Sequence, residues 1–106
     1  MIARLWSART TPAQTHAYLS HFSMSVQPTL RQFPGYAGSA VMTREVQGSI
    51  EILVTTLWQS REAIDAFASP DPETAVVAPE AAALLTEYDR HVRHYEIAST
   101  DTFSIA

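Results

Sequence analysis

The sequence predicts a small α+β protein with the ferredoxin-like order β-α-β-β-α-β and a four-stranded antiparallel sheet. Three observations predict this fold. The chain has 106 residues, which suits a single domain. Apolar residues recur at helical spacing in two segments, whereas other segments have the pattern of strands. The strongest strand pattern, over residues 49–58, is apolar on both faces. We expect the domain to cover residues 1–98, followed by a C-terminal tail over residues 99–106.

The first half of the chain predicts a strand followed by a broken helix. Residues 2–8 alternate in the manner of a strand. Residues 11–14, Thr-Pro-Ala-Gln, are typical of a helix start, because a capping Thr with Gln three residues later forms a capping box. Apolar side chains then follow at helical spacing, at Leu19, Phe22, Val26, Leu30 and Phe33. Pro28 lies inside this pattern and predicts a kink or break near residues 24–28.

The second half predicts the remaining strands and a second helical region. The strands are expected over residues 36–44, 49–58 and 89–98. A hairpin turn over residues 45–48 would join the first two of them. Ser60 would cap a helix that carries Ile64 and Phe67. The prolines of residues 69–72 interrupt this helix, and residues 73–88 resume a helical pattern rich in Ala and Leu.

The third strand predicts that the sheet is buried on both faces. One face of this strand is apolar at Ile50, Ile52, Val54 and Trp58, and the other at Leu53 and Leu57. At about 25 cal/mol per Å², leaving a few hundred Å² of such a face in water would forgo several kcal/mol. Packing against a second copy of the sheet removes this loss. Alternatively, the helices and the tail of one chain wrap both faces.

The composition excludes several classes of function. The chain contains no Cys, which excludes disulfides, thiolate zinc sites and iron–sulfur clusters, and no Lys, which excludes Schiff-base chemistry. The net charge is −4 without a basic cluster, so nucleic acid is not an expected partner. No apolar run approaches the roughly 20 residues of a membrane span, and residues 1–6 lack the pattern of a signal peptide. We expect a cytoplasmic protein.

Four segments together resemble a known family. They are residues 2–6 (Ile-Ala-Arg-Leu-Trp), 34–38 (Pro-Gly-Tyr-Ala-Gly), 55–64 (Thr-Thr-Leu-Trp-Gln-Ser-Arg-Glu-Ala-Ile) and 94–97 (His-Tyr-Glu-Ile). In order and spacing the chain resembles the antibiotic biosynthesis monooxygenase family over about residues 2–97. The resemblance implies a homodimer in which two four-stranded sheets form a dimeric α+β barrel, with a small-molecule cavity in each subunit. It also implies oxygenases that act on aromatic polyketides or quinols without metal or flavin, or enzymes that degrade haem.

The sequence departs from the active members of that family. The haem-degrading branch pairs a first-strand Asn and a third-strand Trp with a His on the second helix. Trp58 matches the Trp, but the chain contains no Asn and residues 60–88 contain no His. Haem degradation is therefore not expected. The missing Asn also weakens the transfer of the polyketide oxygenase mechanism, since that branch resembles the haem branch in using an Asn.

The histidines of the last strand suggest a base rather than a metal site. His91 and His94 point to opposite faces of a strand, so they do not share an ion, and no metal is expected. His94 and Glu96 share a face, and a carboxylate next to a His can fix its tautomer and raise its basicity. His94 could thus serve as a general base oriented by Glu96. Alternatively, both residues face water or a partner at the edge of the sheet.

Other candidate residues would bind the substrate. Arg4 shares a face with Trp6 and could hold a phenolate or carboxylate, or form a structural ion pair with Glu51 or Glu96. Trp58 could wall a pocket or belong to the plain core. On the first helix, Tyr18 and His21 could supply a hydroxyl and an imidazole to a cavity. Alternatively, they form a half-exposed flank of the helix.

The hypothesis that follows is a cofactor-independent monooxygenase or related oxidoreductase acting on a small aromatic or quinol-like substrate. Trp58, Trp6 and Phe67 would wall the pocket, Arg4 would bind the anion and His94 would act as base. One alternative is a non-catalytic dimeric module that binds a small apolar ligand. Another is an isomerase or cyclase that uses the same base without oxygen.

Overall fold

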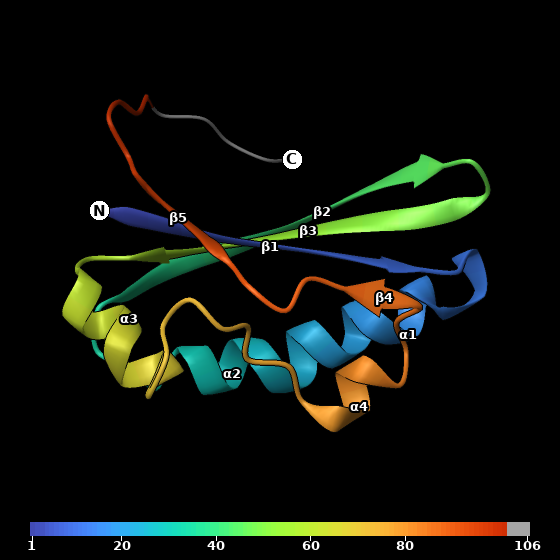
Figure 1. Ribbon diagram of the computed structural model, residues 1–106, viewed down its shortest axis with the longest axis horizontal. Coiled ribbons are helices and arrows are strands. Elements are labelled where there is room, and N and C mark those ends of the chain that lie inside the picture. Colours follow the sequence, from blue (N-terminus) through green and yellow to red (C-terminus); the bar gives the residue numbers. More distant parts are fainter. Residues whose placement is uncertain (102–106) are drawn as a thin grey trace.

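An antiparallel sheet carries the helices on one of its faces in the computed structural model, which describes residues 1–101 (Figure 1). The elements are β1 (Ile2–Thr10), α1 (Pro12–His21), a π-helical turn η1 (Phe22–Val26), α2 (Gln27–Leu30), β2 (Tyr36–Val46), β3 (Ser49–Trp58), α3 (Arg61–Ala68), α4 (Pro79–Ala82), β4 (Glu87–Tyr88) and β5 (Arg93–Glu96). No helix in this part of the chain is long and apolar enough to cross a membrane.

The sheet has the order β2-β3-β1, and both β4 and β5 pair with the free side of β1. Because β4 and β5 pair with different parts of β1, together they occupy the fourth position of the sheet. The ferredoxin-like order and the four-stranded antiparallel sheet are therefore confirmed. The last strand is shorter than the predicted residues 89–98, since β5 begins only at Arg93.

The predicted break in the first helix is confirmed. Thr11 caps α1 by accepting a hydrogen bond from the Gln14 backbone N–H at 3.2 Å. After His21 the helix widens into η1, where the N–H of Gln27 donates to the carbonyl of Phe22. Pro28 lacks an N–H and crowds the carbonyl four residues earlier, so the regular helical ladder is interrupted just before it.

The prediction of a helix over residues 73–88 is wrong. Only α4 is helical there, and residues 74–78 run extended along the chain that leads to β5. The Ala75 N–H donates to the Arg90 carbonyl at 2.8 Å, and the Val92 N–H donates to the Glu73 carbonyl at 2.9 Å. This pairing satisfies the backbone in an extended conformation, which the β-branched Val76 and Val77 favour over a helix.

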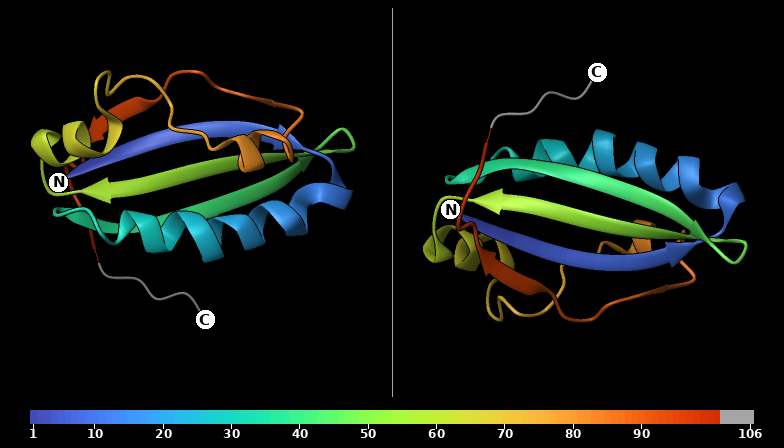
Figure 2. Two further views of the ribbon diagram at one scale, coloured as in Figure 1. Left: turned by 90° about the horizontal axis from the view of Figure 1, so that it is seen from below. Right: turned by 90° about the horizontal axis from the view of Figure 1, so that it is seen from above.

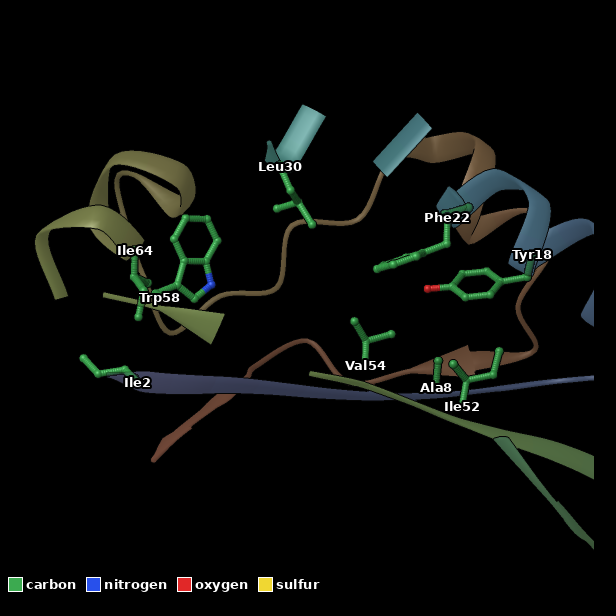
Figure 3. Close-up of a cluster of buried hydrophobic side chains, with 10 residues drawn as sticks. Ile2, Ala8, Tyr18, Phe22, Leu30, Ile52, Val54, Trp58 and Ile64 are labelled. Carbon is green, nitrogen blue, oxygen red and sulfur yellow. The ribbon is translucent and has the colours of Figure 1, made fainter. Parts of the chain in front are cut away.

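The core lies between the sheet and the helices (Figure 3). Along α1, η1 and α2, the side chains that face the sheet are Tyr18, Phe22, Val26 and Leu30. These follow one another at intervals of four residues, whereas Leu19, which the sequence placed in the apolar stripe, is 37% exposed. Trp58 and Ile52 of β3 are fully buried beneath this layer.

The opposite face of the sheet carries no helix in residues 1–101; seen from above in Figure 2, the strands lie in front of the helices. Along β3, buried residues alternate with half-buried ones, and the half-buried set includes Leu53 and Leu57. The strand register places Met42 opposite Leu53 and Leu5 opposite Thr55 on this face, and Met42 is exposed. One chain therefore buries one of the two apolar faces predicted for β3.

The turn between α2 and β2 yields a testable prediction. Gly35 has φ +88°, and a Cβ at this position would lie 2.6 Å from the Cβ of Ala63. Gly35→Ala should cost about 1–2 kcal/mol for the left-handed conformation and about 1–3 kcal/mol for the overlap. The control Gly48→Ala, at φ +83° with nothing nearby, should show only the first loss. Urea denaturation measures both, and equal losses would contradict the contact with Ala63.

Candidate active site

A cavity of about 80 Å³ lies between the helical layer and the sheet. Its walls come from every layer of the fold, including the continuous run of α1, η1 and α2, which we call the long helix. The lining residues are Arg4, Trp6, Val54 and Thr56 of the sheet, Tyr18, His21, Phe22, Val26 and Leu30 of the long helix, Phe67 of α3, residues 75–78, Ala81 and Val92. Figure 3 shows Tyr18 and Phe22 projecting toward Val54 across this space. The cavity continues into a wider groove between the long helix and residues 76–80, which we call the mouth. Most of the lining is apolar, so the site suits a small apolar ligand.

Arg4 places a positive charge in this apolar site. Its side chain is 5% exposed, and its Nη1 donates to the Pro72 carbonyl while Nη2 donates to the Thr74 carbonyl at 3.0 Å. The guanidinium carbon lies 5.6 Å from the ring centre of Phe67. Burial lowers the pKa of Arg4, although the negative charge of Glu73 partly opposes this shift. Within residues 1–101, no carboxylate oxygen lies within 4.0 Å of the guanidinium.

The alternative of a structural ion pair between Arg4 and Glu51 or Glu96 is wrong. The register places Glu51 opposite Arg9, on the sheet face that carries no helix. There it pairs with Arg44 at 2.9 Å. Glu96 is exposed, two residues beyond the position that pairs with Arg4. Arg4 therefore has no carboxylate within 4.0 Å in residues 1–101, and the charge of Glu73 compensates it only in part.

His94 lies behind Arg4 and does not line the cavity. Its Nε2 is 3.0 Å from Nη1 of Arg4. Because arginine only donates, Nε2 accepts this bond and the ring proton sits on Nδ1. Burial, together with the charges of Arg4 and Arg61, lowers the pKa of His94, so the ring is held neutral. The lone pair that a general base needs is thus already engaged by Arg4.

Glu96 does not orient His94. The carboxylate near His94 belongs to Glu73, whose Oε1 is 3.6 Å from Nδ1, which is longer than a hydrogen bond. Glu73 also lies 3.5 Å from Nη2 of Arg61. The alternative in which His94 faces water is wrong as well, because its side chain is only 5% exposed. Glu73 escaped prediction because residues 73–88 had the composition of a helix.

The aromatic residues form one wall in two layers. Trp58 is fully buried and belongs to the core, where its Nε1 donates to Oγ1 of Thr56 at 2.8 Å. It stacks on Phe67 with ring centres 5.3 Å apart, and Phe67 in turn lines the cavity. Trp6 lines the cavity directly, and its Nε1 donates to the Asp89 carbonyl at 2.7 Å. Trp58 thus supports the wall from behind.

Tyr18 and His21 both line the cavity. Tyr18 is 3% exposed, so the expectation of a half-exposed flank is wrong for this residue. Burial raises the pKa of Tyr18 to about 12, and the hydroxyl therefore stays protonated and can donate a hydrogen bond. Nε2 of His21 is buried without a hydrogen-bond partner.

The described residues contain no group of three His, Asp or Glu side chains that could hold a metal ion. His91 is exposed and pairs through its backbone with Thr74, whereas His94 is buried beside Arg4. The two histidines therefore lie in different environments, and His91 precedes β5, so the predicted opposite faces of one strand do not apply to it.

Comparison with known proteins places the chain among related folds. Residues 1–94 match the family described as antibiotic biosynthesis monooxygenase. No curated protein matches the chain. A candidate antibiotic biosynthesis monooxygenase from Bacillus cereus has a TM-score of 0.68 at 16% identity and covers 96% of this chain and 97% of its own.

Two further solved structures differ in their chemistry. The haem degrader MhuD from Mycobacterium tuberculosis, with two haems bound in its active site, has a TM-score of 0.61 at 22% identity, over 96% of this chain and 100% of that chain. SnoaB, a cofactor-independent oxygenase from Streptomyces nogalater, has a TM-score of 0.55 at 16% identity, over 93% and 95% of the two chains. At these identities the likeness establishes a shared fold.

The contact between His94 and Arg4 yields a prediction about pH. Because burial lowers the pKa of His94 below its ordinary value of 6.5, the unfolded chain binds this proton at a higher pH than the folded protein. The free energy of unfolding should therefore decrease as the pH falls below about 6.5 and stop decreasing at the folded pKa. Urea denaturation between about pH 7.5 and about pH 5 measures this loss. It should be smaller in His94→Gln, and an equal loss in both proteins would contradict a depressed pKa.

Proposed function

Because this chain belongs to the antibiotic biosynthesis monooxygenase family, we propose that it is a monooxygenase that oxidises a small aromatic or quinol-like substrate in the cavity between sheet and helices. The observation that carries the proposal is Arg4, a buried cation that lines an apolar cavity without a carboxylate partner within residues 1–101. A buried charge of this kind favours an anionic ligand group. The apolar walls favour a flat hydrophobic body for the same ligand.

The hydrogen bonds of Arg4 define how a substrate would bind. Nη1 is engaged by Pro72 and His94, and one N–H of Nη2 is engaged by Thr74. The Nε–H and the second N–H of Nη2 make no hydrogen bond within residues 1–101. A guanidinium pairs with carboxylates and phenolates through such free donors. Tyr18, which stays protonated, supplies a further donor within the cavity.

The chemistry needs no external reductant. When a phenol loses its proton, the phenolate can pass an electron to dioxygen. The full reaction of a phenol with one dioxygen gives a quinone and one water, so that one oxygen atom enters the substrate and the substrate supplies all the electrons. Arg4 would lower the pKa of the bound phenol by stabilising the phenolate. SnoaB, with the same fold, is a cofactor-independent oxygenase, which supports this proposal.

The residues of the cavity do not fit haem. The chain lacks any Asn, and no His occurs in residues 60–88, where the resemblance places the iron ligand. His94, in turn, is held by Arg4. In the proposed reaction His94 positions the guanidinium rather than acting as the base.

A second candidate function is a non-catalytic module that binds a small apolar ligand. The observation that favours it is the engaged lone pair of His94, which leaves the predicted base without a free acceptor. A bound phenol that raises the melting temperature without any uptake of oxygen would support this candidate over the monooxygenase.

We also propose that two copies pack through the sheet face that carries no helix. Leu53 and Leu57 lie half-buried on this face, and the register places Met42 next to Leu53. A second sheet would remove these side chains from water, at about 25 cal/mol per Å² buried. The homodimer implied by the family resemblance has this arrangement.

The reaction is tested with 1-naphthol, a small bicyclic phenol, and ¹⁸O₂. Wild-type protein should consume one dioxygen per 1,4-naphthoquinone formed, with one ¹⁸O atom in the product. Arg4→Gln should lower the rate by about 10²- to 10³-fold, as expected for the loss of a donor to a developing anion. The control Arg31→Gln changes an exposed arginine of the same charge and should leave the rate unchanged.

Two outcomes would contradict the proposed reaction. A quinone without ¹⁸O would indicate an oxidase that releases hydrogen peroxide, and no oxygen uptake would favour the binding module. Because Arg4 also holds residues 72–74, Arg4→Gln could lose rate through misfolding. Tyr18→Phe therefore provides a second variant. It keeps the ring and removes only the hydroxyl, and its melting temperature is compared with that of the wild type.

The proposed dimer is tested by sedimentation. Wild-type protein should sediment at about twice the mass of the 11.7 kDa chain at micromolar concentration. Leu53→Glu places a charge in the proposed interface and should sediment as a single chain. The control Met24→Glu places the same charge on a side chain that is 78% exposed in the helical layer, and should remain dimeric. A monomeric wild type would contradict the proposal.

A further inference from the structure

His21 is the imidazole of the cavity that has no assigned role. Of the four histidines of the sequence, His16 and His91 are exposed, and His94 is engaged by Arg4 outside the cavity lining. His21 lines both the cavity and the mouth. Its Nε2 is buried and makes no hydrogen bond, which costs about 1–3 kcal/mol for a polar atom withdrawn from water. A ligand that exchanges a proton with Nε2 would remove this cost.

The local structure explains why His21 and Tyr18 share the cavity. Tyr18 lies three residues before His21 on α1, which places the two side chains on neighbouring positions of the same helical face. The π-helical turn η1 begins immediately after His21. Such turns interrupt the regular series of α-helical backbone hydrogen bonds and are frequent at functional sites. The hydroxyl of Tyr18 remains a donor, and Nε2 of His21 has no hydrogen-bond partner within residues 1–101.

Arg4 and His21 approach the cavity from opposite layers. Arg4 lies on β1 in the sheet, and His21 lies at the end of α1 in the helical layer. A ligand between the two layers can therefore present an oxygen to Arg4 and a proton to His21 at the same time. That geometry suits a substrate whose acidic proton is conjugated with its oxygen, as in a cyclic aromatic ketone and its enol.

We propose that His21 is the base of this site, and that with Arg4 it catalyses the enolisation of cyclic aromatic ketones, a reaction that needs no oxygen. Nε2 takes the proton from the carbon next to the carbonyl. The electron pair of the broken C–H bond forms the carbon–carbon double bond, and the carbonyl π pair moves onto the oxygen, where Arg4 stabilises the enolate. Return of the proton from the imidazolium to carbon restores the ketone. This inference rests on the proposed function for the place of the substrate and extends it to an oxygen-independent activity.

The experiment measures proton transfer without oxygen. 2-Tetralone, a bicyclic ketone with acidic hydrogens at C1, is incubated anaerobically in D₂O with the protein, and exchange at C1 is followed by NMR. Wild type should accelerate the exchange. His21→Gln should slow it by about 10²- to 10⁴-fold, the usual contribution of a general base. The control His16→Gln removes an exposed imidazole from the same helix and should exchange at the wild-type rate.

A second measurement requires no variant. On addition of 2-naphthol to ¹⁵N-labelled wild type, the Nε2 signal of His21 should shift while that of His16 stays in place, because only His21 would meet the ligand. Exchange that is lost in His21→Gln supports the inference even if the protein takes up no oxygen, in which case the monooxygenase proposal alone fails. Equal exchange in His21→Gln and wild type, an absence of exchange in wild type, or an unchanged His21 signal would each overturn the role of His21.

Discussion

The hydrogen bonds of the Arg4 guanidinium connect three parts of the chain that lie far apart in sequence. Arg4 is on β1, the carbonyls that it binds belong to Pro72 and Thr74, and its third partner, His94, is on β5. Residues 75–78, which follow these carbonyls, form a wall of the cavity. The same side chain therefore holds the wall in its extended conformation and supplies the positive charge that lines the cavity. Loss of this charge would alter the shape of the site together with its electrostatics.

The bond from Arg4 also determines what His94 can do. A neutral imidazole has a single acceptor nitrogen, and in His94 this nitrogen receives a hydrogen bond from Arg4. The neighbouring positive charges further disfavour a proton on the ring. His94 therefore suits the task of fixing the guanidinium better than that of removing a proton from a substrate. The base that the proposed chemistry requires would then come from the helical layer, where Nε2 of His21 has no hydrogen-bond partner within residues 1–101.

The parts of the fold that depend on local sequence could be predicted. The capping residues Thr11 and Ser60 and the break before Pro28 are short-range effects, and the two-residue period of residues 49–58 locates β3. Residues 73–88 could not be assigned correctly, because their Ala and Leu content favours a helix whereas their extended conformation depends on pairing with residues 90–92. That pairing is formed between distant segments and leaves no local pattern.

The candidate site also has one part that could be predicted from local sequence and one part that could not. The shared face of Arg4 and Trp6 follows from the period of a strand, and both residues line the cavity. The carboxylate beside His94 could not be predicted in this way. Positions two apart on a strand, such as His94 and Glu96, are about 7 Å apart. Glu73, which does approach His94, comes from a distant segment. Nor could the sequence decide that Tyr18 rather than Leu19 faces the sheet, because the phase of the helix depends on η1.

The distribution of charge argues that the burial of Arg4 serves a ligand rather than stability. The chain has 11 acidic and seven basic residues, so carboxylates are available to neutralise every arginine. Arg44 and Glu51 form an ion pair at the surface, where such pairs contribute little to stability. Arg4, which is buried and would gain most from a carboxylate, has none within 4.0 Å in residues 1–101. A buried cation that Glu73 compensates only in part lowers the stability of the empty protein, and the proposed anionic ligand would restore it, so the energetic cost of Arg4 would become binding energy.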